Sequence, residues 1–259
     1  MKFPTIIKGA VFDVDDTLLD NQAGVESGTI HEHSRFKAVL GVAEKYDIAS
    51  LRTLTAQENL DAFLNAKVHS LPGAVWGTLF LKGVVDSEDF DPNHPLLNEI
   101  STLKDEIHAE VLRELGVEVI GASLFIRTLA EKYGIKDHMA IASTAVRRDI
   151  DIFLDELTDL RGYFPDSHIV SLESIHYTEA KPHPAAFDKA FKTLGLPEED
   201  RAHVLAFEDD PRGIRSAKAA GLYVCAITTR FAADHEALLA AKPDMIIDSY
   251  DDFMKILNV

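Results

Sequence analysis

Cysteine and long apolar runs are both scarce in this chain. Cys225 is the only cysteine, so no internal disulfide can form, which fits a reducing compartment and makes a cytoplasmic location the expectation. No apolar run is long enough for a transmembrane helix. The first five residues lead straight into a predicted strand, which leaves no room for a signal peptide. The sequence therefore favours a water-soluble globular protein.

Positive charge is also in short supply. The chain has 26 Lys and Arg residues against 43 Asp and Glu residues, a formal net charge of −17. A field of this sign disfavours nucleic acid and anionic membranes, so neither is expected as a partner. A phosphorylated ligand would need local positive charge, from a metal ion or from particular Lys and Arg side chains.

Two hydrophobic periodicities divide the chain. After a first strand at residues 6–12, helical spacing dominates as far as residue 115, and beyond residue 121 short apolar strands alternate with amphipathic helices. Such alternation is typical of a doubly wound parallel sheet. We therefore predict an α/β core, residues 1–23 and 116–259, interrupted by a helical insert, residues 24–115. An insert at this point could act as a lid over the strand ends.

The pattern also predicts individual elements. Helices of the insert are expected at residues 33–46 and 96–115, and apolar residues from Leu60 to Leu71 have helical spacing as well. Residues 72–95 are not assigned. The further strands of the core are predicted at residues 139–142, 168–171, 203–207, 222–227 and 245–247, and its helices at 124–133, 148–157, 185–194, 213–220, 234–241 and a last one ending near 257.

An acidic cluster directly follows the first predicted strand. Strand alternation places the side chains of Asp13 and Asp15 on the same side, with Val14 pointing away. Ligands of open α/β sheets bind beyond the carboxyl ends of the strands. Two converging carboxylates there indicate a magnesium site, or a nucleophile beside a general acid. The simpler alternative is an N-cap cluster that opens a helix near Thr17.

Three further polar motifs follow later predicted strands. Ser143 and Thr144 directly follow the predicted strand at residues 139–142. Hydroxyl and backbone N–H groups at a strand end can bind phosphate, or can simply cap the next helix. Lys181 lies just before a helix and could offset the repulsion between carboxylates. Glu208 and Asp209 open a second acidic cluster, whose oxygens suit a hard metal ion such as Mg²⁺.

These four motifs, in this order, resemble the haloacid dehalogenase superfamily of phosphotransferases. The first motif of that family is DxDx[TV], matched by Asp13, Asp15 and Thr17, and the second ends in Ser or Thr, matched by Ser143. Its third motif is a lysine, often within KPxP, matched by residues 181–184. The fourth is an acidic pair before GIxxAxxAG, matched by residues 208–209 and 213–221. The insert resembles the helical cap of the subgroup that holds small-metabolite phosphatases and β-phosphoglucomutase.

The resemblance implies a function and roles for the matching residues. Asp13 would form an aspartyl-phosphate, and Asp15 would serve as general acid and base, with Lys181 completing the catalytic group. Mg²⁺ would be held by Asp13, Asp15, Asp209 and Glu208. Ser143, Thr144 and Thr17 are the candidates for substrate contacts, although Thr17 is mainly expected to support its loop. The implied activity is a magnesium-dependent phosphatase acting on a small phosphorylated metabolite.

Several alternatives stay open at this point. A phosphomutase of the β-phosphoglucomutase type would share the whole core, and a non-catalytic phosphate- or partner-binding protein could use the same scaffold. The chain could be a monomer or a small homo-oligomer. Asp210 stands where the resembled subgroup often has Ser, which adds a negative charge near the metal site. In the insert, His69, Trp76 and Lys82 are candidate substrate contacts, and Trp76 is expected to pack.

Overall fold

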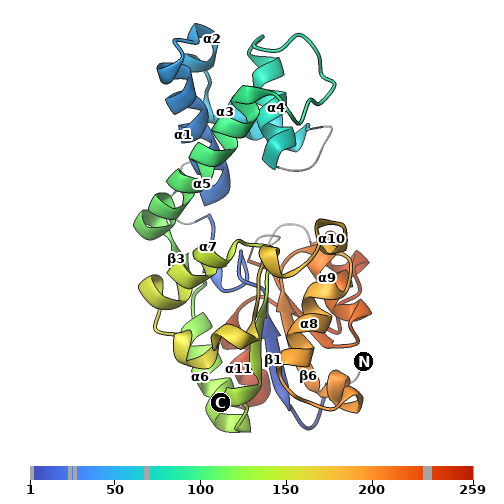
Figure 1. The fold of residues 1–259 in the computed structure, drawn as a ribbon. Coiled ribbons are helices and arrows are strands. Elements are labelled where there is room, and N and C mark those ends of the chain that lie inside the picture. Colours follow the sequence, from blue (N-terminus) through green and yellow to red (C-terminus); the bar gives the residue numbers. More distant parts are fainter. Residues whose placement is uncertain (1–2, 23–24, 26–27, 67–70, 230–234, 259) are drawn as a thin grey trace. The chain divides into compact units, whose positions relative to one another are not determined.

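A computed structural model of the chain describes residues 3–22, 25, 28–66, 71–229 and 235–258. The chain forms two compact units, Met1–Asp20 with Val117–Val259, and Asn21–Gly116. We call them the α/β unit and the helical unit (Figure 1). In the described part of the chain, every helix falls short of the length and apolar character that crossing a membrane requires.

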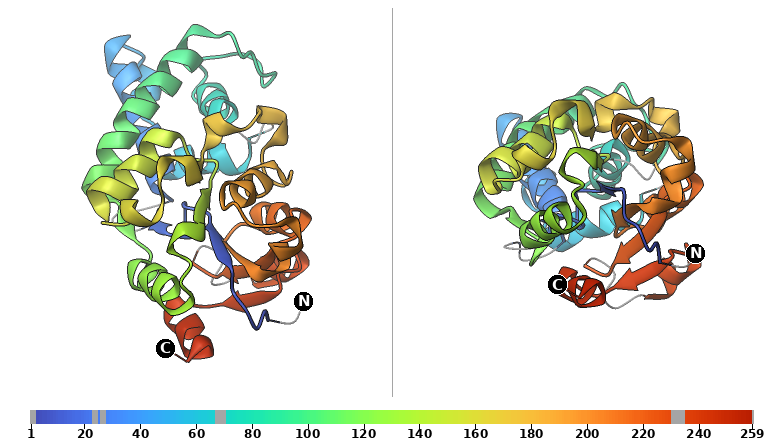
Figure 2. Two further views of the ribbon diagram at one scale, coloured as in Figure 1. Left: turned by 60° about the horizontal axis from the view of Figure 1, so that its bottom comes forward. Right: turned by 90° about the horizontal axis from the view of Figure 1, so that it is seen from below.

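The α/β unit is built on a six-stranded parallel sheet with the order β5-β4-β1-β6-β7-β8. This confirms the predicted doubly wound fold. Its strands are β1 (Gly9–Phe12), β4 (Met139–Ala142), β5 (Ile169–Val170), β6 (Val204–Glu208), β7 (Tyr223–Ile227) and β8 (Met245–Ile247). β1 lies in the interior of the sheet, between β4 and β6, and Figure 2 shows it in blue. Two neighbours therefore bring their carboxyl ends beside that of β1.

Helices cover both faces of this sheet. They are α6 (Ala122–Tyr133), α7 (Arg147–Ile152), α8 (Ala185–Thr193), α9 (Pro211–Ala219), α10 (His235–Ala240) and α11 (Tyr250–Leu257). On one face, the aliphatic side chains of the strands pack against α8, α9 and α10. On the other, Phe12 and Phe207 of adjacent strands stack at 5.0 Å, and Phe125 of α6 stacks on Tyr250 of α11 at 4.8 Å. These buried layers hold the strand ends in place.

Some predicted elements of this unit were wrong in their bounds. β1 begins at Gly9 rather than at residue 6, because its partners begin opposite it: Gly9 pairs with Val204, and Ala10 with Met139. β6 extends one residue further than expected, to Glu208. The predicted helix at residues 148–157 is α7 followed by a π-helical turn, Phe153–Leu157. An unpredicted antiparallel pair, β2 (Leu19–Asp20) with β3 (Val117–Glu118), joins two distant segments.

The helical unit contains α1 (Ile30–Lys45), α2 (Ala49–Arg52), α3 (Ala56–Leu64), α4 (Leu71–Leu81) and α5 (Pro95–Leu115). Its apolar core is formed by α1, α4, α5 and the segment between α1 and α3. The buried guanidinium of Arg35 links α1 to α3 by donating to the side-chain and main-chain oxygens of Asn59, at 3.0 and 2.7 Å. Polar as well as apolar contacts therefore fix this bundle.

The apolar spacing from Leu60 to Leu71 does not form one helix. α3 ends at Leu64, whose side chain is 61% exposed, and Leu71 begins α4. Val68 of that pattern lies outside the described residues, as does His69. α4 was not predicted, because its eleven residues carry no charged side chain and show no apolar stripe.

Candidate active site

The register of the sheet brings the two acidic motifs together. Phe12 lies opposite Phe207, so Asp13 follows β1 next to Glu208 at the end of β6, and the Asp13 N–H donates to the Phe207 carbonyl at 3.0 Å. The side chains of Asp13 and Glu208 are both buried, and Asp209 beside them is only 2% exposed. Residues almost 200 positions apart in the sequence thus share one site.

Lys181 lies between two of these carboxylates. Its ammonium donates to Asp13 Oδ1 at 2.5 Å and to Glu208 Oε1 at 2.6 Å, and it lies 5.0 Å from the centre of the Phe187 ring. Burial alone would lower the pKa of Lys181, but Asp13 and Glu208 outweigh it and hold the pKa above its ordinary value. Lys181 therefore remains an ammonium.

Negative charge is in excess despite this lysine. Burial raises the pKa of Asp13 well above its ordinary value; the charges of Glu208 and Asp15 raise it further, and Lys181 opposes them. Asp13, Glu208 and Asp209 each offer a carboxylate oxygen, and these oxygens lie within 4.8 Å of one another. Three oxygen ligands with surplus negative charge fit a hard divalent cation, so this cluster could hold a metal ion.

Glycine at position 213 makes room for the Glu208 carboxylate. A Cβ placed there would lie 1.5 Å from Glu208 Oε1, so Glu208 packs directly against the backbone of α9. The N–H of Asp210 donates to Glu208 Oε2 at 2.8 Å. Asp210 itself caps α9 by accepting from the Arg212 N–H at 2.7 Å, and it forms an ion pair with the Arg212 guanidinium. A neighbouring arginine therefore balances the extra charge noted in the sequence.

The loop that follows Asp13 is held by contacts that the sequence did not reveal. Asp16 adopts a φ of 58°, a left-handed conformation that Asp tolerates better than most residues, and its N–H donates to the Leu19 carbonyl. Thr17 is fully buried; its hydroxyl donates to Asp209 at 3.3 Å, and its carbonyl accepts from the Tyr250 hydroxyl at 2.9 Å. No sequence signal distinguishes Tyr250 from an ordinary core tyrosine.

The second motif lies at the end of β4, the other neighbour of β1. The Ser143 N–H donates to the Val170 carbonyl at 2.9 Å, and its hydroxyl accepts from the Ala145 N–H at 3.0 Å. Ser143 is buried, whereas Thr144 is exposed. Asp15 is partly exposed and is close enough for its charge to act on Asp13. Among the candidates in the helical unit, Lys82 forms an ion pair with Glu58 at 3.0 Å.

Fold and site together are typical of one class: α/β enzymes that place carboxylates and a buried lysine at the carboxyl ends of parallel strands, where the acidic cluster could hold a cation. The chain belongs to the haloacid dehalogenase-like hydrolase family, whose family model matches residues 7–221. This confirms the resemblance seen in the four motifs.

Comparison with individual proteins gives a sequence relative and several structural ones. Glycerol-1-phosphate phosphohydrolase 1 of Saccharomyces cerevisiae is 31% identical over 167 residues, which are 62% of this chain and 62% of that protein. The match thus spans about three fifths of that relative. A Thermotoga maritima structure named as a candidate β-phosphoglucomutase has a TM-score of 0.69 at 20% identity, over 97% of this chain and 99% of that chain. CbbY from Rhodobacter sphaeroides, in complex with phosphate, has a TM-score of 0.63 at 21% identity, over 96% of each chain.

Proposed function

We propose that the chain is a magnesium-dependent phosphatase that hydrolyses a small phosphorylated metabolite through an aspartyl-phosphate. The observation that carries the proposal is the buried group formed by Asp13, Lys181, Glu208 and Asp209 at adjacent strand ends. Membership of a hydrolase family supports it, and so does the sequence relative named as a phosphohydrolase.

The acidic cluster is the proposed metal site. Asp13, Asp209 and the main-chain carbonyl of Asp15 would hold Mg²⁺, with Glu208 as a ligand directly or through water. Mg²⁺ keeps several waters and needs few protein ligands, which suits this set. When bound, it supplies neutralising charge to the carboxylates and to the phosphoryl oxygens.

Asp13 and Asp15 would carry the chemistry. A carboxylate oxygen of Asp13 attacks phosphorus while the bond to the leaving oxygen breaks, and Asp15 donates its proton to that oxygen. In the second half, Asp15 takes a proton from water, which attacks phosphorus and releases Asp13 and inorganic phosphate.

The other residues would position these groups. Lys181, which donates a hydrogen bond to Asp13, would orient the nucleophile and pair with phosphoryl oxygens. Ser143 and Thr144 lie at the end of the next strand and would contact the phosphate. Thr17 is buried against Asp209, so its proposed part is to hold that ligand rather than to touch substrate. The helical insert, residues 24–115, would serve as the cap that selects the substrate.

The covalent mechanism is tested by replacing the nucleophile. Asp13→Asn should abolish phosphate release while leaving the fold intact, and stability should rise because one repelling carboxylate is removed. Asp137→Asn, at an exposed position of the α/β unit, is the matched control and should keep full activity. Substantial turnover by Asp13→Asn would refute the mechanism. Metal dependence is tested separately: EDTA should stop phosphate release, and Mg²⁺ should restore it.

A substrate assay separates phosphatase from mutase. Purified protein with Mg²⁺ is given a panel of phosphorylated metabolites that begins with glycerol 1-phosphate, the compound in the name of the sequence relative. A phosphatase releases inorganic phosphate as fast as it consumes substrate. A mutase, given β-glucose 1-phosphate and a bisphosphate primer, forms glucose 6-phosphate while free phosphate stays nearly constant. That second result would replace our proposal with the phosphomutase.

A further inference from the structure

Helix α11 of the α/β unit reaches the loop that follows Asp13. The helix begins at Tyr250, whose phenol O–H donates to the main-chain carbonyl of Thr17 at 2.9 Å. Tyr250 and Thr17 are both fully buried. Tyr250 lies outside residues 7–221, the part of the chain that the family model matches, so membership of the family assigns this residue no role.

Aromatic rings surround the Tyr250 side chain. Its ring stacks on that of Phe125 with the ring centres 4.8 Å apart, and the centre of the Phe207 ring lies 6.1 Å away. A phenylalanine would make these ring contacts equally well, and a buried hydroxyl among them is unfavourable unless it has a hydrogen-bond partner. The hydroxyl therefore serves its hydrogen bond to Thr17 rather than the packing of the core.

Thr17 connects this hydrogen bond to the acidic cluster. Its N–H donates to the Val14 carbonyl at 3.2 Å, and its hydroxyl donates to Asp209 Oδ1 at 3.3 Å. The backbone of Thr17 is thus held at both its N–H and its carbonyl, and the χ1 angle of a β-branched side chain is restricted. The Tyr250 hydroxyl therefore helps to set where the Thr17 hydroxyl meets the Asp209 carboxylate.

The Tyr250 phenol keeps the proton that this contact needs. Burial raises the pKa of Tyr250 well above its ordinary value, and the negative charges of Asp13 and Asp209 raise it further. Tyr250 is therefore a hydrogen-bond donor at neutral pH, close enough to the acidic cluster for those charges to act on it.

We propose that Tyr250 is a positioning residue of the metal site, which holds Asp209 through Thr17 in the orientation that binds Mg²⁺. The inference rests on the proposed function, because it takes the acidic cluster as the Mg²⁺ site. Groups that hydrogen-bond to metal ligands orient them, and their loss typically weakens metal affinity by about 10- to 100-fold. Tyr250 acts one contact further from the ligand than Thr17, so its hydroxyl should contribute a smaller factor, about threefold to tenfold.

Mg²⁺ affinity is the measurement that tests the proposal. Isothermal titration calorimetry of the full-length protein with Mg²⁺, in the absence of substrate, gives the dissociation constant independently of turnover. Thr17→Val should raise that constant by about 10- to 100-fold, and Tyr250→Phe by about threefold to tenfold. In a Thr17→Val background, Tyr250→Phe should raise it no further, because the hydroxyl that Tyr250 positions is already gone.

A variant of the same helix separates positioning from stability. Phe253 is a fully buried residue of α11 that packs edge-on against Phe125, with ring centres 5.4 Å apart. Phe253→Leu removes part of this packing but leaves the Tyr250 hydroxyl in place. It should lower the free energy of unfolding in urea, as Tyr250→Phe does, yet leave the Mg²⁺ dissociation constant unchanged.

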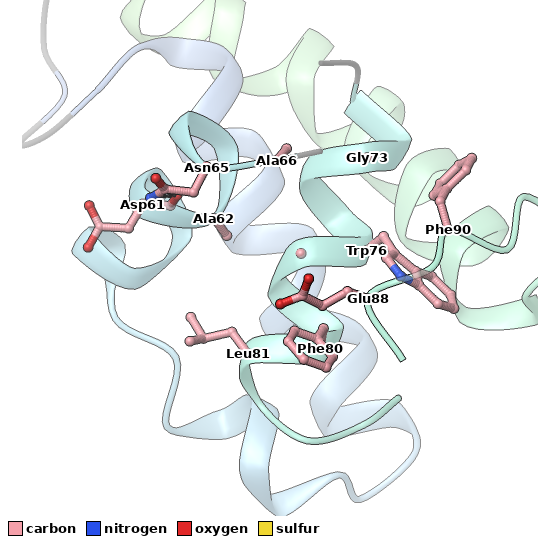
Figure 3. Close-up of a pocket in the computed structure, with 11 residues that line it drawn as sticks. Asp61, Ala62, Asn65, Ala66, Gly73, Trp76, Phe80, Leu81, Glu88 and Phe90 are labelled. Atoms are coloured by element: carbon pink, nitrogen blue, oxygen red, sulfur yellow. Dashed lines mark hydrogen bonds between the residues drawn. The ribbon is translucent and has the colours of Figure 1, made fainter. Parts of the chain in front are cut away.

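Trp76 gives an independent check on folding. It is the only tryptophan of the chain and lies in the helical unit, where it lines a cavity of about 410 Å³ together with Phe80 and Phe90 (Figure 3). Its emission spectrum therefore reports the structure of the helical unit, and it should be the same in wild type and in every variant.

The outcomes distinguish this inference from the proposed function. Asp209→Asn should weaken Mg²⁺ binding at least as much as Thr17→Val. If wild type does not bind Mg²⁺, or if Asp209→Asn binds it as tightly as wild type, the metal site itself is wrong and the inference falls with it. If Asp209→Asn loses Mg²⁺ while Tyr250→Phe binds it as tightly as wild type, or while Phe253→Leu weakens binding as much as Tyr250→Phe, positioning by Tyr250 is refuted and the metal site stands.

Discussion

Replacing Gly213 with alanine tests the architecture of the acidic cluster most directly. Gly213 lies in α9 without a positive φ, so its backbone accepts alanine. The obstacle is the side chain of Glu208: the new Cβ would lie 1.5 Å from Oε1 and 2.0 Å from Cδ. To reach ordinary contact, the carboxylate must move by about 2 Å.

That movement has a cost that can be worked out. Glu208 is 1% exposed and accepts from Lys181 at 2.6 Å and from the Asp210 N–H at 2.8 Å. A hydrogen bond to a charged group contributes about 1.5–3 kcal/mol, and part of this is lost at each partner. We expect Gly213→Ala to lower the free energy of unfolding by about 2–4 kcal/mol, and the melting temperature by about 4–16 °C.

Activity should fall as well. Glu208 holds Lys181, and Lys181 holds Asp13, so a displaced carboxylate disturbs the nucleophile. Misplacement by about 1 Å can reduce turnover by about 100-fold. Thermal unfolding by circular dichroism and phosphate release under saturating Mg²⁺ measure the two effects.

A matched variant and a double mutant make the test specific. Gly162 is exposed, and a Cβ there meets nothing within 4 Å, so Gly162→Ala should leave stability and activity unchanged. In a Glu208→Ala background, Gly213→Ala should add little, because its obstacle is gone. If Gly213→Ala matches Gly162→Ala, or stays equally harmful without Glu208, the reasoning is wrong.

Three further predictions follow from single contacts. Tyr250→Phe keeps the ring stack on Phe125 but leaves the buried Thr17 carbonyl without its hydrogen-bond donor. Urea denaturation should show that the free energy of unfolding falls by about 1–3 kcal/mol, and kcat should fall by a larger factor than KM changes. Asp244→Asn removes the ion pair to Lys218 at 2.7 Å, so the free energy of unfolding at pH 7, measured in urea, should fall by about 1–3 kcal/mol. Burial would raise the pKa of Asp244, but hydrogen bonds from Lys218 and the Val224 N–H lower it overall. The contribution of the carboxylate to stability is therefore fully present above its ordinary pKa of about 3.9 and is lost as the pH falls through the lowered pKa of the folded state, so the difference in free energy of unfolding between wild type and Asp244→Asn should shrink as the pH falls below about 3.9.

Sequence patterns located the core elements well where their signal was strong. The strand at residues 139–142 is β4 to the residue, and α5 begins one residue before the predicted helix at 96–115, because Pro95 suits a first helical turn. The predictions failed where contacts with other elements of the fold decide where a strand begins or whether a segment becomes a helix. β1 is short because β6 begins opposite Gly9 and β4 begins opposite Ala10. α4 has no apolar stripe because nearly all its described side chains between Ala74 and Leu79 are buried.

What the sequence determined by itself was the order of local signals: alternating strands and helices, and four polar motifs at strand ends. Local patterns carry this information because apolar periodicity and turn residues act within a few positions of the chain. The tertiary structure alone decided which of those polar groups meet. The pairing of Phe12 with Phe207 sets Asp13 beside Glu208, Lys181 joins them, and Gly213 makes space for the carboxylate. Tyr250 reaches Thr17 from the last helix, 233 residues away, and only packing between distant segments can specify such a contact.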